Sequence, residues 1–334
     1  MKTRVVQVSA ESPDPSIISQ AARTLREGGL VAFPTETVYG LGADVTNPDA
    51  VKKIFLSKGR PSDNPLIVHV SSFEAAKLFV EEIPSSVNTL AKRFWPGPMT
   101  LVLQSKPGVS SIVRAGLETV AVRVPNHPVA LGLLKEFGGG IVAPSANRSG
   151  RPSPTRASHV LADLDGSVDL ILDAGPTTIG VESTVIDATV SPVEILRQGG
   201  LTNEEIQHAI GQIHIGGGAD RERRSPGTRY RHYAPNASVI LVERGDATRM
   251  KIEIENMGSV SRAACIYSSS DVSKIVGKMP NAFYEPDPAA LAGKLFDLFR
   301  SFDAAGVEKI FVEEPEESGI GSALLERLRK AAAK

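Results

Sequence analysis

Short apolar runs alternate with amphipathic stretches along the first two-thirds of the chain. The apolar runs are typical of buried strands, and we expect strands at 5–8, 30–33, 66–70, 99–104, 119–125, 140–145, 169–175, 183–189 and 193–197. Helical spacing and capping residues predict helices at 14–29, 47–55, 73–80, 84–93, 127–136 and 155–162. Strands with interspersed helices indicate an α/β or α+β domain over residues 1–210.

The pattern changes after residue 210. Residues 211–236 are rich in Gly, Arg and Pro and show little hydrophobic periodicity, which predicts a linker. Residues 237–334 then alternate between strand and helix patterns, with strands expected at 238–243, 263–268, 281–285 and 308–314. This alternation predicts a second, smaller Rossmann-like domain with a parallel sheet. No Gly-x-Gly-x-x-Gly follows its first strand, so the sequence indicates no dinucleotide site.

Composition and charge restrict the function classes. The formal net charge is −1, so no global field draws the chain to nucleic acid or membrane, and any anion site must be local. The single cysteine, Cys265, cannot form an internal disulfide or a cysteine metal cluster, which suits a reducing cytosol. The chain has no signal-like start and no apolar run long enough for a membrane span. We therefore expect a soluble, cytoplasmic protein.

Two polar stretches follow predicted strands or helices in the first domain. The stretch FPTETVYGLGADV at 33–45 combines hydroxyls, a carboxylate and two glycines, Gly40 and Gly42, which we expect to permit backbone turns. It fits either a capped turn or the lip of a ligand pocket. The loop SKGRPSDNP at 57–65 places Lys58 and Arg60 beside two prolines. That pairing suits a polyphosphate, although solvated surface cations are the more frequent case.

Two charged or titratable residues lie inside apolar strands. Arg123 lies within 119–125 and needs an anionic partner there, which the residues leave open as a protein carboxylate or a ligand. His69 lies within 66–70. A strand histidine is more often a hydrogen-bonded core group than a catalyst, but the order of loop and strand would bring it near Lys58 and Arg60.

Further polar donors gather in two other loops and in the linker. The stretch VAPSANRSGRPSPT at 142–155 could cradle phosphates with Ser145 and Ser153, or it could be a plain connection. Ser183 begins a predicted strand and Arg197 ends another. The Arg-rich, aromatic linker would suit either RNA or closure over the first domain.

Several catalytic classes are excluded by their missing motifs. The chain has no Walker Gly-x-x-x-x-Gly-Lys-Ser/Thr pattern, no His-Glu-x-x-His helix and no Gly-x-Ser-x-Gly elbow. Cys265 lies in a predicted strand of the second domain, and we interpret it as a packing residue. Anion-binding loops without an evident nucleophile favour catalysis by positioning and charge stabilisation.

Six segments together resemble the YrdC-like family of threonylcarbamoyl-AMP synthases: FPTETVYGLGAD, KGRPSDNPLIVH, FWPGPMTLVL, VAVRVP, APSANRSGRPSPT and ESTVID. The resemblance spans residues 10–210. The following SPGTRYRHYAP and α/β domain are similar to the two-domain form of the family. The resemblance implies a twisted mixed sheet with a basic cavity. It also implies a reaction in which a threonine carbamate, made from L-threonine and bicarbonate or CO2, attacks the α-phosphorus of ATP and releases pyrophosphate.

The resemblance also assigns residues by motif. It implies catalytic charge from Lys58 and Arg60. It implies ATP contacts from Arg60, Asn64, Thr119, Ser145, Ser153, Arg197 and His232. It implies threonine contacts from Thr37, His69, Arg123, Ala143 (through its backbone) and Ser183. Mg²⁺ is expected with ATP; its ligands are left unknown, with Glu36 the nearest candidate. Tyr230, His232 and Tyr233 would cover the site if the linker 211–236 acts as a lid.

The resemblance implies a partner, and two other functions compete with it. In the family the product goes to a tRNA threonylcarbamoyl-transferase complex, and weak RNA binding is a second expectation. One alternative is an RNA-binding module, which near-zero net charge and few aromatic residues disfavour. The other is the carbamoyl-transfer enzyme of hydrogenase maturation, whose zinc finger a chain with one cysteine cannot form.

Overall fold

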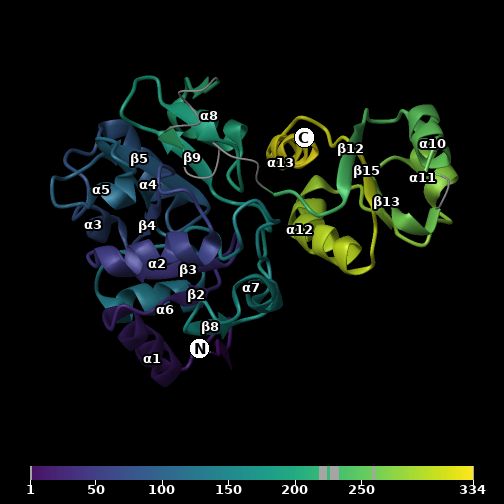
Figure 1. Ribbon diagram of the computed structural model, residues 1–334. Helices are drawn as coiled ribbons and strands as arrows, with labels where there is room; N and C mark the ends of the chain where they lie inside the picture. The colour runs from purple at the N-terminus through teal and green to yellow at the C-terminus, as the bar shows by residue number, and fades with distance from the viewer. Residues whose placement is uncertain (1, 218–223, 226–232, 258–259, 334) are drawn as a thin grey trace. The chain divides into compact units, whose positions relative to one another are not determined.

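The computed structural model describes residues 2–217, 224–225, 233–257 and 260–333 (Figure 1). The chain divides into two compact units. The first consists of Met1–Ser149 and Ser153–Tyr230, and the second of Gly150–Pro152 and Arg231–Lys334. The predicted lid residues Tyr230 and His232 lie outside the described residues. No helix in the described part of the chain is both long enough and apolar enough to span a membrane.

The described residues of the first unit form a mixed sheet of eleven strands in the order β1-β8-β2-β3-β7-β4-β6-β5-β9-β10-β11. The strands are β1 (Arg4–Gln7), β2 (Val31–Phe33), β3 (Gly40–Asp44), β4 (Ile67–His69), β5 (Met99–Gln104), β6 (Thr119–Arg123), β7 (Ile141–Val142), β8 (Leu170–Asp173), β9 (Thr184–Asp187), β10 (Glu194–Arg197) and β11 (His214–Ile215). The helices are α1 (Pro15–Arg26), α2 (Pro48–Lys58), α3 (Phe73–Ala76), α4 (Ser85–Phe94), α5 (Ser111–Arg114), α6 (Pro128–Phe137), α7 (Ala157–Leu164) and α8 (Asn203–Ile210).

Helices pack on this sheet through their apolar faces. A smaller cluster joins α1 and α6 to β2 and β8, with Leu25, Leu133 and Leu170 among its buried members. The larger cluster includes Ile54 of α2 and Leu90 of α4 and continues across the middle strands. Alternation along each strand separates residues that enter this core from residues on the other face, because successive side chains point to opposite sides.

Every strand predicted for residues 1–210 overlaps an observed strand, but the interpretation of 33–45 was wrong in part. Gly40 and Gly42 lie in β3, which pairs antiparallel with β2 and β7, and neither has a positive φ angle. Their role is close packing. A Cβ atom on Gly42 would lie 2.9 Å from side-chain atoms of both Phe33 and Ile141. The short strand β11 likewise lies inside the expected linker.

The second unit confirms the predicted parallel sheet. Its strands β12 (Ser238–Val242), β13 (Ala263–Tyr267), β14 (Ala282–Tyr284) and β15 (Lys309–Glu313) lie in the order β12-β15-β13-β14 and pair in parallel. The helices are α10 (Ala247–Glu255), η1 (Val260–Arg262), α11 (Ser270–Val276), α12 (Pro288–Ala304) and α13 (Ile320–Ala332). Cys265 is fully buried in this core, and burial raises the pKa of its thiol, so it is an inert packing group.

Two short stretches of the second unit, residues 150–152 and 233–234, lie near its helix α12. The amide of Ala234 donates to the carbonyl of Gly150 at 3.0 Å, and the guanidinium of Arg300 on α12 donates to the carbonyl of Pro152. Tyr233, expected to cover the site of the first domain if the linker acts as a lid, is buried and contacts helix α12 of this unit. Its ring stacks on Phe296 of the same helix, with 5.6 Å between ring centroids.

Candidate active site

The register of four neighbouring strands places polar side chains in one row across the first sheet. His69 at the end of β4 pairs with Arg123 at the end of β6, and Arg123 pairs with Thr100 on β5. Paired residues project to the same face of a sheet, so these three side chains are neighbours. Ser183 completes the row just before β9, where its hydroxyl shares a hydrogen bond with that of Thr100 at 2.8 Å. We call His69, Arg123, Thr100 and Ser183 the polar row.

All four members of the polar row are buried, with side chains between fully buried and 4% exposed. Burial, and then the neighbouring Arg123 cation, lower the pKa of His69 to about 3. His69 is therefore neutral at physiological pH and can share a hydrogen bond without carrying charge. The sequence analysis did not single out Thr100 as a candidate site residue. Its signal is the same as that of Arg123: a polar side chain in the middle of an apolar strand.

Glu36 supplies the anionic partner that the sequence left open for Arg123. Its carboxylate lies 2.8 Å from the Arg123 guanidinium, and the two side chains are 7% and 4% exposed. Glu36 comes from the connection between β2 and β3. The amide of Ile179 donates to its carbonyl at 2.9 Å and fixes this connection from the other side.

Thr37 follows Glu36 and is fully buried. Its hydroxyl lies 2.8 Å from the hydroxyl of Thr35, and the amide of Gly180 donates to its carbonyl at 3.1 Å. The connection that carries Glu36 and Thr37 is thus held by its own hydroxyls and by residues 179–180. A connection fixed in this way can present a charged side chain with little loss of entropy on ligand binding.

The loop at 144–155 is tied to the strands and to helix α2. The amide of Ala146 donates to the carbonyl of Tyr39 at 2.8 Å. The ammonium of Lys58, at the end of α2, donates to the carbonyl of Asn147 at 2.6 Å and to the carbonyl of Ser145. Lys58 is only 3% exposed. It therefore lies beneath this loop rather than on the surface, where the sequence alone could have placed it.

The loop after α2 folds back on itself. Gly59 ends the helix at φ +59°, in the left-handed region that favours glycine. The guanidinium of the half-buried Arg60 then donates to the carbonyl of Pro65 at 3.1 Å, and Asn64 is buried. Burial, and then the nearby Arg60 cation, hold the pKa of Lys58 well below its usual value.

The remaining residues predicted to contact ATP lie at different distances from the polar row. Arg197, at the end of β10, donates to the carbonyl and hydroxyl of Ser183 at 2.8 and 3.1 Å, so it lies against the polar row. Ser153 donates to the carboxylate of Glu182, a buried residue that the sequence analysis missed. Thr119 begins β6, about 13 Å from Arg123 at the usual strand rise.

Ala143 follows β7. Its amide donates to the carbonyl of Ile67 at 3.0 Å, and Ile67 lies on β4, the strand that carries His69. The side chain of Ala143 is buried. Within the described ranges, no three His, Cys, Asp or Glu side chains lie close enough together to hold a metal ion. Glu36, the nearest candidate ligand for Mg²⁺, is engaged with Arg123.

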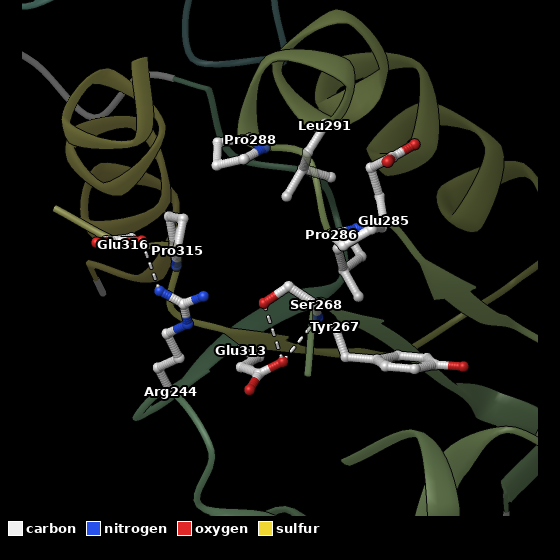
Figure 2. Close-up of a pocket in the computed structure, with 11 residues that line it drawn as sticks. Arg244, Tyr267, Ser268, Glu285, Pro286, Pro288, Leu291, Glu313, Pro315 and Glu316 are labelled. Atoms are coloured by element: carbon white, nitrogen blue, oxygen red, sulfur yellow. Dashed lines mark hydrogen bonds and ion pairs between the residues drawn. The ribbon is translucent and has the colours of Figure 1, made fainter. Parts of the chain in front are cut away.

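A second set of polar residues lies at the carboxyl ends of the strands in the second unit. Figure 2 shows a small pocket there, with Pro286, Pro288 and Pro315 on its walls. Arg244, which follows β12, forms an ion pair with Glu316 at 3.0 Å. The carboxyl ends of parallel strands are the usual place for ligands in such folds.

The donors of this second pocket are taken by a protein carboxylate. Glu313, at the end of β15, accepts from the amides of Ser268 and Ser269 at 2.7 and 2.9 Å and from the amide of Gly245 at 2.8 Å. Burial alone would raise the pKa of Glu313, but these donors hold it below its usual value. The backbone amides that could cradle a phosphate are therefore already bound to Glu313.

Comparison with known proteins covers both units. A family model described as "Telomere recombination" matches residues 23–199, and a model described as "Threonylcarbamoyl-AMP synthase, C-terminal domain" matches residues 201–333. A threonylcarbamoyl-AMP synthase of Pyrococcus abyssi is 47% identical over 93% of this chain and 92% of its own. One from Bacillus subtilis is 45% identical over 99% and 98% of the two chains.

A solved structure is similar over the same length. The crystal structure of P. abyssi Sua5 complexed with L-threonine superposes with a TM-score of 0.90 at 45% identity, covering 99% of this chain and 98% of that one. Escherichia coli YciO shares the fold over 59% of this chain, with a TM-score of 0.55 at 23% identity.

Proposed function

The chain belongs to the threonylcarbamoyl-AMP synthase family, and we propose that the polar row and the loops around it are where this nucleotidyltransferase makes its product. The enzyme joins L-threonine, ATP and bicarbonate or CO2 into threonylcarbamoyl-AMP and pyrophosphate. The observation that carries the proposal is the pair of matches to both domains, together with the L-threonine complex of a relative that is 45% identical over 99% of this chain.

The threonine half of the reaction is assigned to the polar row. Arg123 takes the carboxylate of L-threonine, because a buried guanidinium offers a fixed, desolvated fork of donors. Neutral His69, Thr37 and Ser183 surround the hydroxyl and amino groups. The backbone of Ala143 contributes the remaining polar contact. Each of these groups is held by neighbouring strands or by the fixed connection at 35–38, which favours orientation of the carbamate.

The ATP half is assigned to the two loops after α2 and β7 and to Arg197. Its proposed contacts are Arg60, Asn64, Thr119, Ser145, Ser153, Arg197 and His232, the last outside the described residues. Lys58 holds the carbonyls of the 144–155 loop and stands close to Arg60. A polyphosphate would relieve the repulsion between these two cations, so the lowered pKa of Lys58 favours an anionic ligand nearby.

The chemistry needs no protein nucleophile. An oxygen of the threonine carbamate forms a bond to the α-phosphorus of ATP, and the bond from this phosphorus to the bridging oxygen breaks as pyrophosphate leaves. The protein contributes alignment and positive charge where negative charge develops. Mg²⁺ bound to the phosphates of ATP would neutralise part of their charge. No dedicated carboxylate cage is found in the described part of the chain.

Membership of the family supports a destination for the product. We assign it to a tRNA threonylcarbamoyl-transferase in the cytoplasm, where ATP and tRNA are present. Direct RNA binding by the linker has less support. Arg224, one of the linker arginines in the described ranges, forms ion pairs with Asp187 and with Glu194, the latter at 2.7 Å. Its charge is thus engaged within the protein.

An omission assay tests the proposed function. The full-length protein is incubated with ATP, MgCl2, bicarbonate and L-threonine, and pyrophosphate release is followed with each substrate left out in turn. We expect release only with all of them present, together with an adenylate that contains threonine. Pyrophosphate release that continues without L-threonine would contradict the proposal.

A further inference from the structure

The Glu36–Arg123 ion pair is unusual for a buried pair. Its two side chains approach to 2.8 Å and are almost fully buried, yet neither oxygen of the Glu36 carboxylate accepts a hydrogen bond from the described residues. The Arg123 nitrogen of the contact, Nη2, also makes none there. Among the described residues, the guanidinium makes one long hydrogen bond, from Nε to the carbonyl of Gly97 at 3.4 Å.

Such a pair contributes little to stability by itself. The loss of hydration on burying two charges can exceed their attraction unless further hydrogen bonds satisfy the remaining donors and lone pairs. Buried polar atoms are otherwise almost always hydrogen-bonded. A carboxylate with open lone pairs, facing a guanidinium with an open donor, is therefore better explained by a ligand than by the fold.

An α-amino acid carries the matching charges. Its ammonium and carboxylate are attached to the same carbon, so one molecule can present a cation to Glu36 and an anion to Arg123 at the same time. Assuming the proposed function, we propose that Glu36 binds the α-ammonium of L-threonine while Arg123 binds its α-carboxylate. The two side chains neutralise each other until this zwitterion replaces one ion pair by two.

The rest of the site fits this arrangement. Glu36 is next to Thr37 in the chain, and its partner Arg123 is paired with His69 on one neighbouring strand and with Thr100 on the other. Hydroxyl-binding groups therefore lie on the same face as the charge pair. Glu36 would make the site select L-threonine over the analogue that lacks the α-ammonium, since a buried charge left without its partner strongly disfavours that ligand.

Glu36→Gln is the variant that tests this inference, because it keeps the shape and removes the charge. Calorimetric titration of the full-length protein measures the binding of L-threonine and of 3-hydroxybutanoate, which keeps the carboxylate and hydroxyl but lacks the ammonium. We expect Glu36→Gln to weaken L-threonine at least tenfold and not to weaken 3-hydroxybutanoate, which has no ammonium for Glu36 to bind. Glu194→Gln, which removes a carboxylate from another ion pair of the same unit, should change neither.

A different result is expected if Glu36 supports Arg123 without contacting L-threonine. If Glu36 only orients Arg123, the Glu36→Gln variant weakens both ligands equally, and the inference is wrong. It is also wrong if L-threonine binding does not change.

The wild-type protein provides a measurement that does not depend on folding of the variant. It should bind L-threonine at least tenfold more tightly than 3-hydroxybutanoate, and equal affinities would overturn the inference. If the wild type binds no L-threonine at all, the proposed function fails instead.

Discussion

Lys58→Met removes the ammonium that ties the 144–155 loop to helix α2 and keeps a side chain of similar length. The wild-type ammonium donates to the carbonyls of Asn147 and Ser145 and is nearly inaccessible to solvent. The amide of Ser149, which donates to the backbone carbonyl of residue 58 at 2.8 Å, stays in place in the variant. The perturbation is therefore restricted to the side-chain contacts of the loop.

The size of the effect follows from two opposing contributions. A hydrogen bond from a charged donor is worth about 1.5–3 kcal/mol, so the two bonds together contribute about 3–6 kcal/mol. Burial of the ammonium opposes this gain, as its lowered pKa indicates. We expect a net loss of about 2–3 kcal/mol in the free energy of unfolding, near the upper end for single substitutions.

Chemical denaturation of the full-length variant measures this loss, and initial rates at varied ATP measure the consequence for the loop. We expect the KM for ATP to rise at least fivefold. Lys53→Met is the matched control, since exposed Lys53 on the same helix donates to one carbonyl, that of Gly28, at 2.8 Å. It should lose less than about 1 kcal/mol, as expected of a surface substitution.

The pH dependence provides an independent check. Because the folded state lowers the pKa of Lys58, the unfolded chain binds more protons between the folded pKa and the ordinary lysine value. Wild-type stability then rises with pH through this window, and Lys58→Met lacks this rise. The difference in the free energy of unfolding between the wild type and Lys58→Met should therefore grow from neutral pH toward pH 10. A variant as stable as the wild type, with an unchanged KM for ATP, would refute the role given to Lys58.

Three further predictions concern the site and the second unit. Arg60→Ala and Arg123→Ala should each lower the rate of product formation at least tenfold, about 1.4 kcal/mol of transition-state stabilisation; wild-type rates in both would contradict the site assignment. Glu313→Gln should destabilise the second unit by about 1.5–3 kcal/mol, since a carboxylate oxygen that accepts from the Gly245 amide is replaced; an unchanged denaturation curve would show that this bond contributes nothing. Arg300→Ala removes the donor to the Pro152 carbonyl next to Ser153; it should raise the KM for ATP severalfold and leave L-threonine affinity unchanged, which separate titrations can check.

The periodicity of the chain was sufficient to predict most strands and the parallel sheet of the second unit. Apolar runs such as 66–70 and 119–125 are unambiguous because they are buried in the middle of the sheet. Strand β3 escaped prediction because its sequence, Gly-Leu-Gly-Ala-Asp, has the small residues of a turn. Its glycines are required by neighbouring side chains that come from other parts of the chain.

The sequence singled out several candidate residues of the site but not their contacts. Arg123 was visible as a charge in an apolar strand, but its partner Glu36 lies 87 positions away in the chain, and only the fold brings them together. The same is true of Lys58, whose acceptors are backbone carbonyls with no sequence signal. The stacking of Tyr233 on Phe296, which belongs to a helix of the second unit, likewise had no signal in the sequence.

The most direct test of the central claim is the composition of the product. The full-length protein is supplied with ATP, ¹³C-bicarbonate and ¹⁵N-L-threonine, and the adenylate formed is analysed by mass spectrometry. We predict a single threonylcarbamoyl-AMP that carries both labels, formed in equal amount to the pyrophosphate released. An adenylate that lacks the ¹³C label, or pyrophosphate released without any threonine-containing adenylate, would contradict the account.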